Sequence, residues 1–346
     1  MSKLNCVSIG DMFVSKAAFD KTLKNSDLFN EYQSFEWNSN LDRVATRTLM
    51  RTIETKGSSV FDLPSEIQNA IINTNVLFIH VCPINGELIR KAHNLKYIIT
   101  ARGGVENIDL KTAHECGVTV IHCPMHNAHG VAELTLGLMI CETRNVTRSN
   151  TALHSGIWRE QYPNSGEIRE IRSCKIGLIG FGTIGQLVSD LLNPFQCKIY
   201  VFDPFVDSSF ITSKGCIPVT KDELLKKSDI VSLHGRIDPN EPPIIRAREL
   251  KLMSKKSYLI NTARAALIDM EALKIALKEK QIRGAALDVF PKEPLDENDE
   301  LINLDNCTLT NHRGGDTIDS YERSPEIMLN QLKEVISTGK TKYMIR

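Results

Sequence analysis

The chain has 346 residues, and its 42 Lys and Arg residues balance 42 Asp and Glu residues, so the formal net charge is zero. This balance excludes a nucleic-acid binder that depends on bulk positive charge, and it excludes an acidic solvating tail. Hydrophobic residues make up 42% of the chain and charged residues 24%, which is typical of a folded globular protein. At about 100–200 residues per domain, the length predicts two domains, each with its own core.

No segment indicates a membrane span or a secretory signal. The longest apolar run, residues 131–141, is interrupted by Glu133, whereas a membrane span needs about 20 apolar residues. The first residues also lack the apolar core of a signal peptide. The nine cysteines are odd in number and form no CxxC motif, which favours reduced thiols. We therefore predict a cytoplasmic protein that binds neither membrane nor nucleic acid.

Short apolar runs alternate with helical patterns through most of the chain, which is typical of an α/β protein with a parallel sheet. In the first part, the predicted elements are strands over 76–79, 97–100 and 118–121 and helices over 89–95 and 110–116. Gly117, which follows the second of these helices, is a common helix stop. These elements predict a first α/β domain.

A second series of strands begins near residue 175, after a long predicted helix over 130–142. Its predicted strands cover residues 175–179, 198–202, 230–233, 258–261, 285–289 and 308–310. The predicted helices between them cover residues 183–192, 221–227 and 270–280. Six strands with intervening helices match one doubly wound dinucleotide-binding domain.

A last helical pattern over 321–337 lies beyond the final predicted strand, so we expect the chain to return there to the first domain. The predicted fold is α/β, with two Rossmann-like domains on doubly wound parallel sheets. We expect a discontinuous substrate domain of residues 1–121 and 316–346, and a dinucleotide-binding domain of residues 122–315.

A glycine motif, Gly180-Phe181-Gly182-Thr183-Ile184-Gly185, follows the predicted strand 175–179 and begins the predicted helix 183–192. In this motif Gly180 permits the tight turn, Gly182 lets the backbone approach a pyrophosphate, and Gly185 allows close helix–strand packing. The helix N-terminus, at Thr183 and Ile184, supplies free N–H groups and a partial positive charge for the phosphates.

The next predicted strand ends at Asp203, about 20 residues beyond the motif, as the dinucleotide fingerprint requires. Its carboxylate is placed to accept hydrogen bonds from the adenosine ribose and would repel a 2′-phosphate. The alternative is a glycine-rich turn beside an acidic surface residue, but the strand–turn–helix–strand–Asp order weighs against it. The motif therefore predicts NAD as the cofactor, rather than NADP.

Hydride transfer between NAD and a hydroxyl carbon also needs a general acid or base, and a cation that orients the substrate carboxylate. Arg264 and His312 each follow a predicted strand, at the carboxyl end where open α/β sheets place their ligands. Glu293 lies in the loop after another such strand. Taken singly, these residues equally fit a helix-start cation, a loop histidine and a solvated acid. Together, in this order after the fingerprint, they predict a catalytic set.

The chain resembles the D-2-hydroxyacid dehydrogenase family over nearly its whole length. Besides the segments above, the resemblance includes Arg102-Gly103-Gly104-Val105-Glu106-Asn107-Ile108-Asp109 and Asn127-Ala128-His129-Gly130-Val131-Ala132-Glu133. It implies an Arg–Glu–His catalytic set at Arg264, Glu293 and His312. Arg264 would bind the carboxylate and carbonyl oxygen, His312 would exchange the proton, and Glu293 would raise the pKa of the imidazole.

The same resemblance implies further contacts with the cofactor and with a second subunit. Asp288 would contact the nicotinamide carboxamide, and His234, Thr262 and Ala263 would lie along the cofactor. The family usually forms homodimers through the cofactor domain, and the helix around residues 131–139 and the nearby Trp158 are our candidates for that contact. Ordinary packing within the chain is the alternative for both.

The expected substrate is a small anionic 2-hydroxyacid or 2-oxoacid. Around His312 the family commonly has Pro before and an apolar residue after, whereas this chain has Asn311 and Arg313. If Arg313 faces the substrate, it adds a cation that would suit a dianionic, phosphorylated or phosphonylated substrate. Arg102 is another candidate cation, and the N–H groups of Gly103 and Gly104 after it could cradle a carboxylate. For Arg102 and Arg313, a side chain turned to solvent is the alternative.

Other functions stay open at this point. D-3-phosphoglycerate is not the favoured substrate, because the Arg-Ser type pair expected after the strand 76–79 is absent. An NAD-sensing co-repressor of the same fold would keep the Arg–Glu–His set without turnover. The spacing of His122, His126 and His129 suggests a metal site, but Pro124 and the end of a strand separate them, so we predict no metal.

Overall fold

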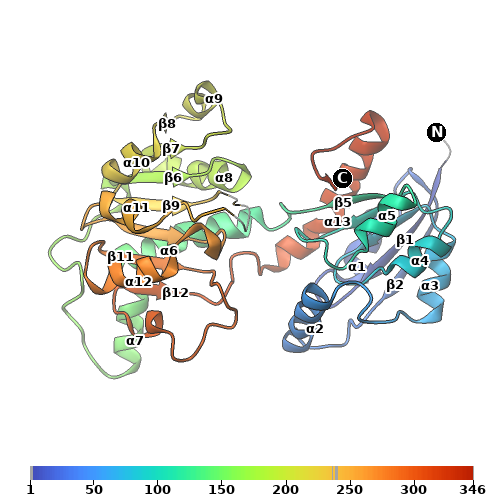
Figure 1. Cartoon of the computed structure of the whole chain (residues 1–346), viewed down its shortest axis with the longest axis horizontal. Coiled ribbons are helices and arrows are strands. Elements are labelled where there is room, and N and C mark those ends of the chain that lie inside the picture. The colour runs from blue at the N-terminus through green and yellow to red at the C-terminus, as the bar shows by residue number, and fades with distance from the viewer. Residues whose placement is uncertain (1–2, 236, 238–240, 346) are drawn as a thin grey trace. The chain divides into compact units, whose positions relative to one another are not determined.

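The computed structural model describes residues 3–235, 237 and 241–345. It divides into two compact units (Figure 1): unit 1 comprises Met1–Asn127 and Thr317–Arg346, and unit 2 comprises Ala128–Asp316. Our predicted boundaries were 121/122 and 315/316. The first of these needs correction, because it would cut the strand Thr119–His122 before its last residue.

Unit 1 is built on a six-stranded sheet in the order β13-β5-β4-β3-β1-β2, in which only β13 runs antiparallel to its neighbour (Figure 1). Its strands are β1 (Leu4–Gly10), β2 (Phe29–Glu36), β3 (Val76–Ile79), β4 (Tyr97–Thr100), β5 (Thr119–His122) and β13 (Met344–Ile345). Its helices are α1 (Lys16–Leu23), α2 (Arg43–Lys56), α3 (Ser65–Ile72), α4 (Gly86–Lys91), α5 (Leu110–Glu115) and α13 (Ile318–Thr338).

Helices cover both faces of this sheet because its strands are apolar on both sides. In β3, Leu77 and Ile79 pack into the core beneath α2 to α5, whereas Val76 and Phe78 pack against α1 and α13. Helix α13 therefore belongs to unit 1 although it ends the chain, which confirms the predicted return to the first domain. The predicted strands 76–79 and 97–100 coincide with β3 and β4, while 118–121 lies one residue early.

Unit 2 has a seven-stranded parallel sheet in the order β12-β11-β10-β9-β6-β7-β8. Its strands are β6 (Lys175–Ile179), β7 (Lys198–Phe202), β8 (Ile217–Pro218), β9 (Ile230–Leu233), β10 (Tyr258–Asn261), β11 (Gly284–Leu287) and β12 (Cys307–Leu309). Its α-helices are α6 (Ala128–Arg144), α7 (Val146–His154), α8 (Thr183–Leu192), α9 (Ser208–Ser213), α10 (Lys221–Lys227), α11 (Ala247–Leu252) and α12 (Met270–Lys278). Short 3₁₀ turns are η1 (Ile171–Ser173), η2 (Asn193–Phe195), η3 (Ala265–Leu267) and η4 (Glu300–Asn303).

The strand order of unit 2 reverses at β6, as in a dinucleotide-binding sheet. The prediction of an α/β fold with two doubly wound sheets is confirmed, and four of the six strands predicted for this unit match to the residue. The prediction of six strands was wrong by one. The additional strand β8 is two residues long, and its Ile217 is exposed, so it carries no apolar run that could reveal it.

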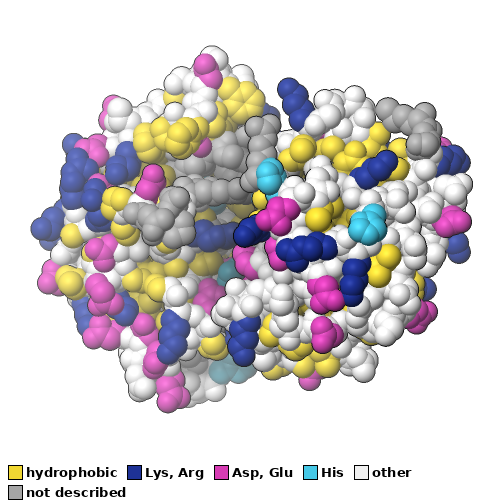
Figure 2. Space-filling model, turned by 45° about the vertical axis from the view of Figure 1, so that its right-hand side comes forward, with side chains coloured by type: hydrophobic (Ala, Val, Ile, Leu, Met, Phe, Trp, Pro, Cys, Tyr) yellow, Lys and Arg dark blue, Asp and Glu magenta, His cyan; other side chains and the backbone are white. Residues whose placement is uncertain are grey.

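Charges are mixed over the surface. On the face drawn in Figure 2, Lys and Arg side chains are interspersed with Asp and Glu side chains, as the balanced composition suggests. In the part of the chain that the structure describes, no helix combines the length and apolar character that a membrane crossing needs.

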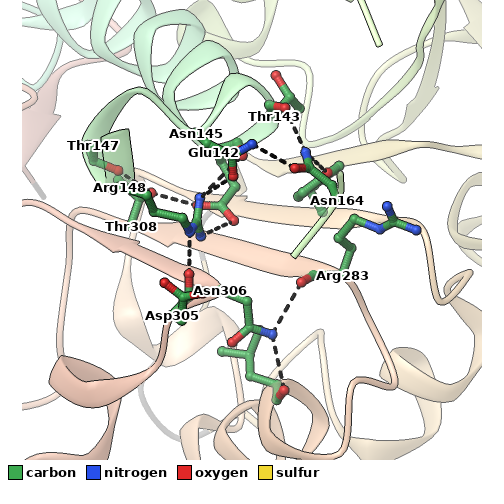
Figure 3. Close-up of polar contacts among 12 residues, drawn as sticks. Glu142, Thr143, Asn145, Thr147, Arg148, Asn164, Arg283, Asp305, Asn306 and Thr308 are labelled. Carbon is green, nitrogen blue, oxygen red and sulfur yellow. Dashed lines mark hydrogen bonds and ion pairs between the residues drawn. The ribbon is translucent and has the colours of Figure 1, made fainter. Parts of the chain in front are cut away.

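A buried ion pair ties α6 and α7 to the sheet of unit 2 (Figure 3). Glu142 Oε1 lies 2.7 Å from Arg148 Nη2, and the Thr308 hydroxyl on β12 donates to Glu142 Oε2 at 2.6 Å. Glu142 is 2% exposed, and Gly284 leaves room for it because a Cβ there would clash with Oε1. Asn145 lies between α6 and α7, and its side-chain amide donates to Asn164 Oδ1 at 2.6 Å. This bond extends the network to the segment after α7.

We expect Arg148→Ala to lower the unfolding free energy of unit 2 by about 3–5 kcal/mol, because Glu142 would stay buried without its cation. Differential scanning calorimetry of the variant and the parent chain measures this. Arg144→Ala, at an exposed position of α6, is the matched control and should change stability by about 0.5 kcal/mol or less. Equal transitions for Arg148→Ala and Arg144→Ala would contradict the role given to the pair.

Candidate active site

The glycine turn after β6 is shaped by close packing at two of its glycines. Gly180 has φ +96°, and a Cβ there would lie 2.5 Å from the backbone nitrogen of Gly235. A Cβ on Gly185 would collide with the Gly180 carbonyl oxygen. Gly182, in contrast, has open space around the position of a Cβ and caps α8 without a side-chain hydrogen bond. Helix α8 therefore begins with the free N–H groups of Thr183 and Ile184, and its N-terminus is open to a phosphate.

Asp203 follows β7 and is tied to this turn. Its Oδ2 accepts a hydrogen bond from the Phe181 N–H at 2.7 Å, and its Oδ1 accepts one from the Phe205 N–H at 2.9 Å. Each carboxylate oxygen has a further lone pair for a ribose hydroxyl. Asp203 thus has a structural task that the sequence did not reveal, beside the one expected from the fingerprint.

His234 follows β9, and its backbone N–H donates to the Ile179 carbonyl at 2.7 Å. Both ring nitrogens are buried, and neither has a hydrogen-bond partner among the described residues. Burial lowers the pKa of His234 to about 4, so the ring is neutral near pH 7. Because unpaired buried polar atoms cost about 1–3 kcal/mol, these nitrogens fit a site completed by a bound polar group such as a dinucleotide.

The turn after β10 is held by the side chain of Asn261. Its Oδ1 accepts from the Ala263 N–H at 3.0 Å, and its amide donates to the Arg264 carbonyl at 2.9 Å. The Thr262 hydroxyl lies 2.7 Å from the Thr135 hydroxyl of α6, so this side chain is directed to the helix. Arg264 is exposed, and its Nη1 donates to the Ala263 carbonyl at 2.7 Å. Asn261 fixes the backbone from which Arg264 extends.

Asp288 follows β11 and anchors the turn after β12. Its buried carboxylate accepts from the Thr310 hydroxyl at 2.6 Å, from the Arg313 N–H at 2.7 Å and from the Gly314 N–H at 2.9 Å. Within this turn His312 has φ +58°, a left-handed conformation that is uncommon for a residue with a side chain. The hydrogen bonds of Asp288 to the two following N–H groups stabilise that conformation.

His312 and Glu293 form a pair. His312 Nδ1 lies 2.8 Å from Glu293 Oε2, and Glu293 Oε1 accepts from the Phe290 N–H at 3.1 Å. The hydrogen bond that His312 donates to Glu293 raises the pKa of His312, and the charges of Glu293 and Asp288 add to this increase, whereas burial and the charge of Arg264 oppose it. Because the carboxylate is an acceptor, Nδ1 carries a proton, and Nε2 is the nitrogen that can exchange a proton with a ligand.

The structure brings these predicted residues to one edge of the unit 2 sheet. They follow the carboxyl ends of its parallel strands, from Asp203 after β7 to His312 after β12. Open α/β sheets bind ligands at this edge. The edge offers a cation, a proton donor held by a carboxylate, and an open helix N-terminus, which is the chemistry that hydride exchange with a carboxylate-bearing substrate requires.

The two additional cations have carboxylate partners. Arg313 Nη1 lies 2.6 Å from Asp316 Oδ2. In unit 1, Arg102 is 6% exposed, and its Nη2 contacts Glu54 at 2.5 Å and Glu106 at 3.6 Å. Its Nη1 is buried and has no hydrogen-bond partner in the described part of the chain. Gly103 and Gly104 follow in an irregular turn, where the Gly103 carbonyl accepts from His122 Nδ1 at 2.8 Å.

Two residues at the carboxyl edge of unit 1 were not assigned from the sequence. Asp11, after β1, accepts from the N–H groups of Phe13, Val14 and Val81 and lies 3.0 Å from His80 Nδ1. Burial alone would raise the pKa of Asp11, but His80 and the N–H groups of Val81 and Phe13 lower it overall. Both residues follow buried strands, and that position is the signal that could have found them.

Two of the three histidines with metal-like spacing bond to backbone carbonyls rather than to another histidine. His122 Nδ1 bonds to the Gly103 carbonyl, and His126 Nδ1 bonds to the Cys123 carbonyl at 2.9 Å. Among residues 3–235, 237 and 241–345, no group of three His, Cys, Asp or Glu side chains is placed to hold a metal ion.

Comparison with known proteins places this site in a family. Residues 136–314 match the model of the D-isomer specific 2-hydroxyacid dehydrogenase NAD-binding domain. The chain is 37% identical over 255 residues to D-3-phosphoglycerate dehydrogenase of Methanocaldococcus jannaschii, which aligns 73% of this chain and 48% of that protein. The chain thus spans about half the length of that relative. It is 33% identical over 289 residues to hydroxypyruvate reductase of Thermotoga maritima, covering 83% of this chain and 92% of that protein.

A solved structure shows the same fold over both units. It is the NAD complex of a D-isomer specific 2-hydroxyacid dehydrogenase from Lactobacillus delbrueckii ssp. bulgaricus, with a TM-score of 0.78 and 21% identity over 99% of this chain and 100% of that one. The glycine turn with its open helix end, Asp203 and the unpaired nitrogens of His234 all fit the dinucleotide that the matched domain binds. The chain belongs to the D-isomer specific 2-hydroxyacid dehydrogenase family, and its cofactor is NAD.

Proposed function

We propose that this protein is an oxidoreductase that transfers a hydride between NAD(H) and a D-2-hydroxyacid or its 2-oxoacid. The observation that carries the proposal is the His312–Glu293 pair, at 2.8 Å, on the strand edge of an NAD-binding domain that also presents Arg264. NAD supplies or accepts the hydride when it is bound. The residues of this chain bind the acid, orient it and exchange the hydroxyl proton.

In reduction, the Arg264 guanidinium would bind the substrate carboxylate and polarise the carbonyl oxygen. His312 would donate its Nε2 proton to that oxygen, and it would accept the proton in oxidation. Glu293 accepts from Nδ1–H and keeps the ring oriented and protonated. Gly103 and Gly104 would contact the acid through their N–H groups.

We propose that the cofactor lies along the carboxyl edge of the unit 2 sheet. Its contacts would come from Gly180, Gly182, Thr183, Ile184, Gly185, Asp203, His234, Thr262, Ala263 and Asp288. The Thr262 side chain already bonds to Thr135 and the Asp288 side chain to the turn after β12, so each would meet the cofactor with its remaining hydrogen-bonding capacity. The carboxylates that pair with Arg102 and Arg313 weigh against a dianionic acid as the preferred substrate.

The first test follows NADH absorbance with glyoxylate, pyruvate, hydroxypyruvate and phosphohydroxypyruvate. We expect turnover of at least one 2-oxoacid, and a loss of kcat of about 10²–10⁴-fold in His312→Asn. Asn is chosen because it tolerates the left-handed backbone of this position. NADH fluorescence should show unchanged cofactor binding.

If the His312→Asn variant keeps its activity, His312 is not the residue that exchanges the proton. If the parent chain binds NADH and reduces none of the acids, the NAD-sensing alternative gains support. If it reduces phosphohydroxypyruvate best, the activity is that of a D-3-phosphoglycerate dehydrogenase.

The pH dependence of reduction should report His312. Because Glu293 raises the pKa of His312, the proton donor stays protonated to a higher pH, and kcat/KM for reduction falls only as the pH rises through that raised pKa. In Glu293→Gln the charge is lost, so the descending limb should shift to lower pH. The measurement is kcat/KM against pH for both proteins. If the descending limb of the pH profile lies at the same pH in both proteins, a group other than His312 controls it.

We further propose that the protein is a homodimer that works in the cytoplasm. The nine cysteines are free thiols, which supports a reducing compartment. Of the predicted dimer contacts, the helix around 131–139 has Leu138 and Met139 buried within unit 2, while Leu134 and Leu136 are partly buried and stay candidates for the contact. Trp158 is 79% exposed, and Leu153, at 53%, and Ile157, at 57%, lie in the same segment. A second copy of the chain is the proposed partner of this apolar segment.

Trp158→Glu combined with Leu153→Glu should shift the protein from dimer to monomer in analytical ultracentrifugation, because charges would replace the apolar contact. Ile275→Glu, at a position that is 53% exposed on α12, is the matched control and should leave the mass unchanged. If the parent chain sediments as a monomer, or the double variant as a dimer, the segment is not the interface.

A further inference from the structure

The turn that carries His312 leads directly into one of the two connections between the units. Unit 2 ends at Asp316, and the chain enters unit 1 at Thr317. Between His312 and this connection lie two consecutive glycines, Gly314 and Gly315. Glycine has more conformational freedom to lose on folding than any other residue. The proposed proton donor therefore stands beside a segment that its sequence alone leaves flexible.

An ion pair spans these two glycines. Arg313 Nη1 lies 2.6 Å from Asp316 Oδ2, and the Asp316 N–H donates to the Arg313 carbonyl at 3.1 Å. The backbone bond closes a four-residue turn with the glycines at its centre, and the ion pair closes the same four residues a second time. The Asp316 side chain is 2% exposed and that of Arg313 is 47% exposed. Because the carboxylate is buried, loss of this ion pair is more costly than loss of a surface pair.

The first half of the turn is packed against the rest of unit 2. Asp288 accepts from the N–H groups of Arg313 and Gly314, and a Cβ on Gly314 would lie 3.1 Å from Asp288 Oδ2 and 3.3 Å from Val131 Cγ2. Gly314 thus fits closely between Asp288 and α6. Val131 lies near the start of α6, just after the other connection between the units, at residues 127 and 128. Within unit 2, both connections therefore begin close to the turn that carries His312.

The contact between His312 and Glu293 depends on the place of this turn. The two side chains come from different loops, and His312 Nδ1 lies 2.8 Å from Glu293 Oε2. His312 also has φ +58°, a left-handed conformation that costs about 1–2 kcal/mol in a residue with a side chain. A turn that is not restrained would relax from this conformation and take the ring away from Glu293. The charges that act on the ring are those of Glu293, Asp288 and Arg264.

We propose that the ion pair of Arg313 with Asp316 is a clasp that holds the turn of His312 rigid at the connection to unit 1. Both are then positioning residues for the proton exchange, and neither contacts the substrate in this role. The proposal rests on the proposed hydride transfer. It gives Arg313 a task inside the protein, in place of the substrate contact that the sequence suggested.

The first test measures the pKa of the His312 ring by NMR titration in Arg313→Leu and in Asp316→Asn, with the resonance identified by its loss in His312→Asn. These two substitutions remove opposite charges, so an effect of charge alone would raise the pKa in Arg313→Leu and lower it in Asp316→Asn. The clasp predicts a decrease in both variants, because a looser turn weakens the contact with Glu293. An increase or no change in Arg313→Leu would overturn the proposal.

The second test measures kcat and KM for the 2-oxoacid that the parent chain reduces. Arg313→Leu and Asp316→Asn should each lower kcat by about 10-fold, because a misplacement of about 1 Å can cost about 10²-fold. The double variant should be no slower than either single variant, and Arg313→Lys should restore part of kcat. If Arg313 instead binds the substrate, KM rises in Arg313→Leu while Asp316→Asn, which keeps the cation, retains kcat. That pattern would overturn the clasp.

Arg246→Leu is the matched control. Arg246 is 49% exposed, and its Nε lies 3.6 Å from Glu249, which is three residues later and 1% exposed, so the spacing and burial of the pair are the same. This variant should keep the parent kcat and the parent pKa of His312. Unchanged NADH binding in each variant shows that unit 2 is folded.

If the parent chain reduces no acid, the proposed function fails, and the clasp is still decided without turnover. The NMR titration applies as before, and hydrogen exchange of residues 310–317 can be followed by mass spectrometry. Exchange should be faster in Arg313→Leu and Asp316→Asn than in the parent chain and in Arg246→Leu. Equal exchange in all four proteins would overturn the proposal.

Discussion

The parallel direction of the strands is the constraint on which the candidate active site and the polar edge of unit 1 both depend. Every parallel strand of a sheet ends at the same edge, so residues far apart in the chain meet there without any local signal between them. In unit 2 this edge collects Asp203, His234, Arg264, Asp288 and His312. In unit 1 the same rule collects Asp11, His80, Arg102 and His126. Buried strands with apolar residues on both faces support each edge, because helices cover both sides of each sheet.

At the edge of unit 2 the backbone is held by side chains that do no chemistry themselves. Asp288 gives its carboxylate to Thr310 and to two N–H groups, and this fixes the left-handed backbone of His312. Asn261 does the same for the turn that ends at Arg264. The proposed catalytic set therefore depends on buried polar residues whose hydrogen bonds are satisfied within the protein, so its geometry exists before a ligand arrives.

Regular elements with strong apolar patterns could be predicted from the sequence, and those with weak patterns could not. Strands β3, β4, β6, β7, β9 and β10 are runs of four or five mostly apolar residues and match their predicted bounds. The edge strand β2 has mostly exposed or half-buried residues, and β8 has two residues, so neither produces an apolar run. No element was predicted before residue 76, although β1 is buried over its last five residues. The family resemblance predicts the Arg–Glu–His set, and the sequence order is enough to place its members after their strands.

What a cation does depends on its partners, and these are invisible in the sequence. Arg102 and Arg313 both stand beside motifs of the family, and by count alone they add two positive charges for a substrate. In the structure Arg313 is paired with Asp316, and Arg102 with Glu54, which comes from a helix almost 50 residues earlier in the chain. In such a pair the carboxylate compensates the charge of the guanidinium, while the remaining N–H groups can still donate hydrogen bonds in fixed directions. Recognition at such a site follows the directions of donors and acceptors more than the total charge. The neutral ring of His126 fits the same principle, because burial removes its charge and leaves a single lone pair. We therefore expect the specificity of this chain within its family to depend on which of its own side chains donate and which accept, rather than on shared motifs.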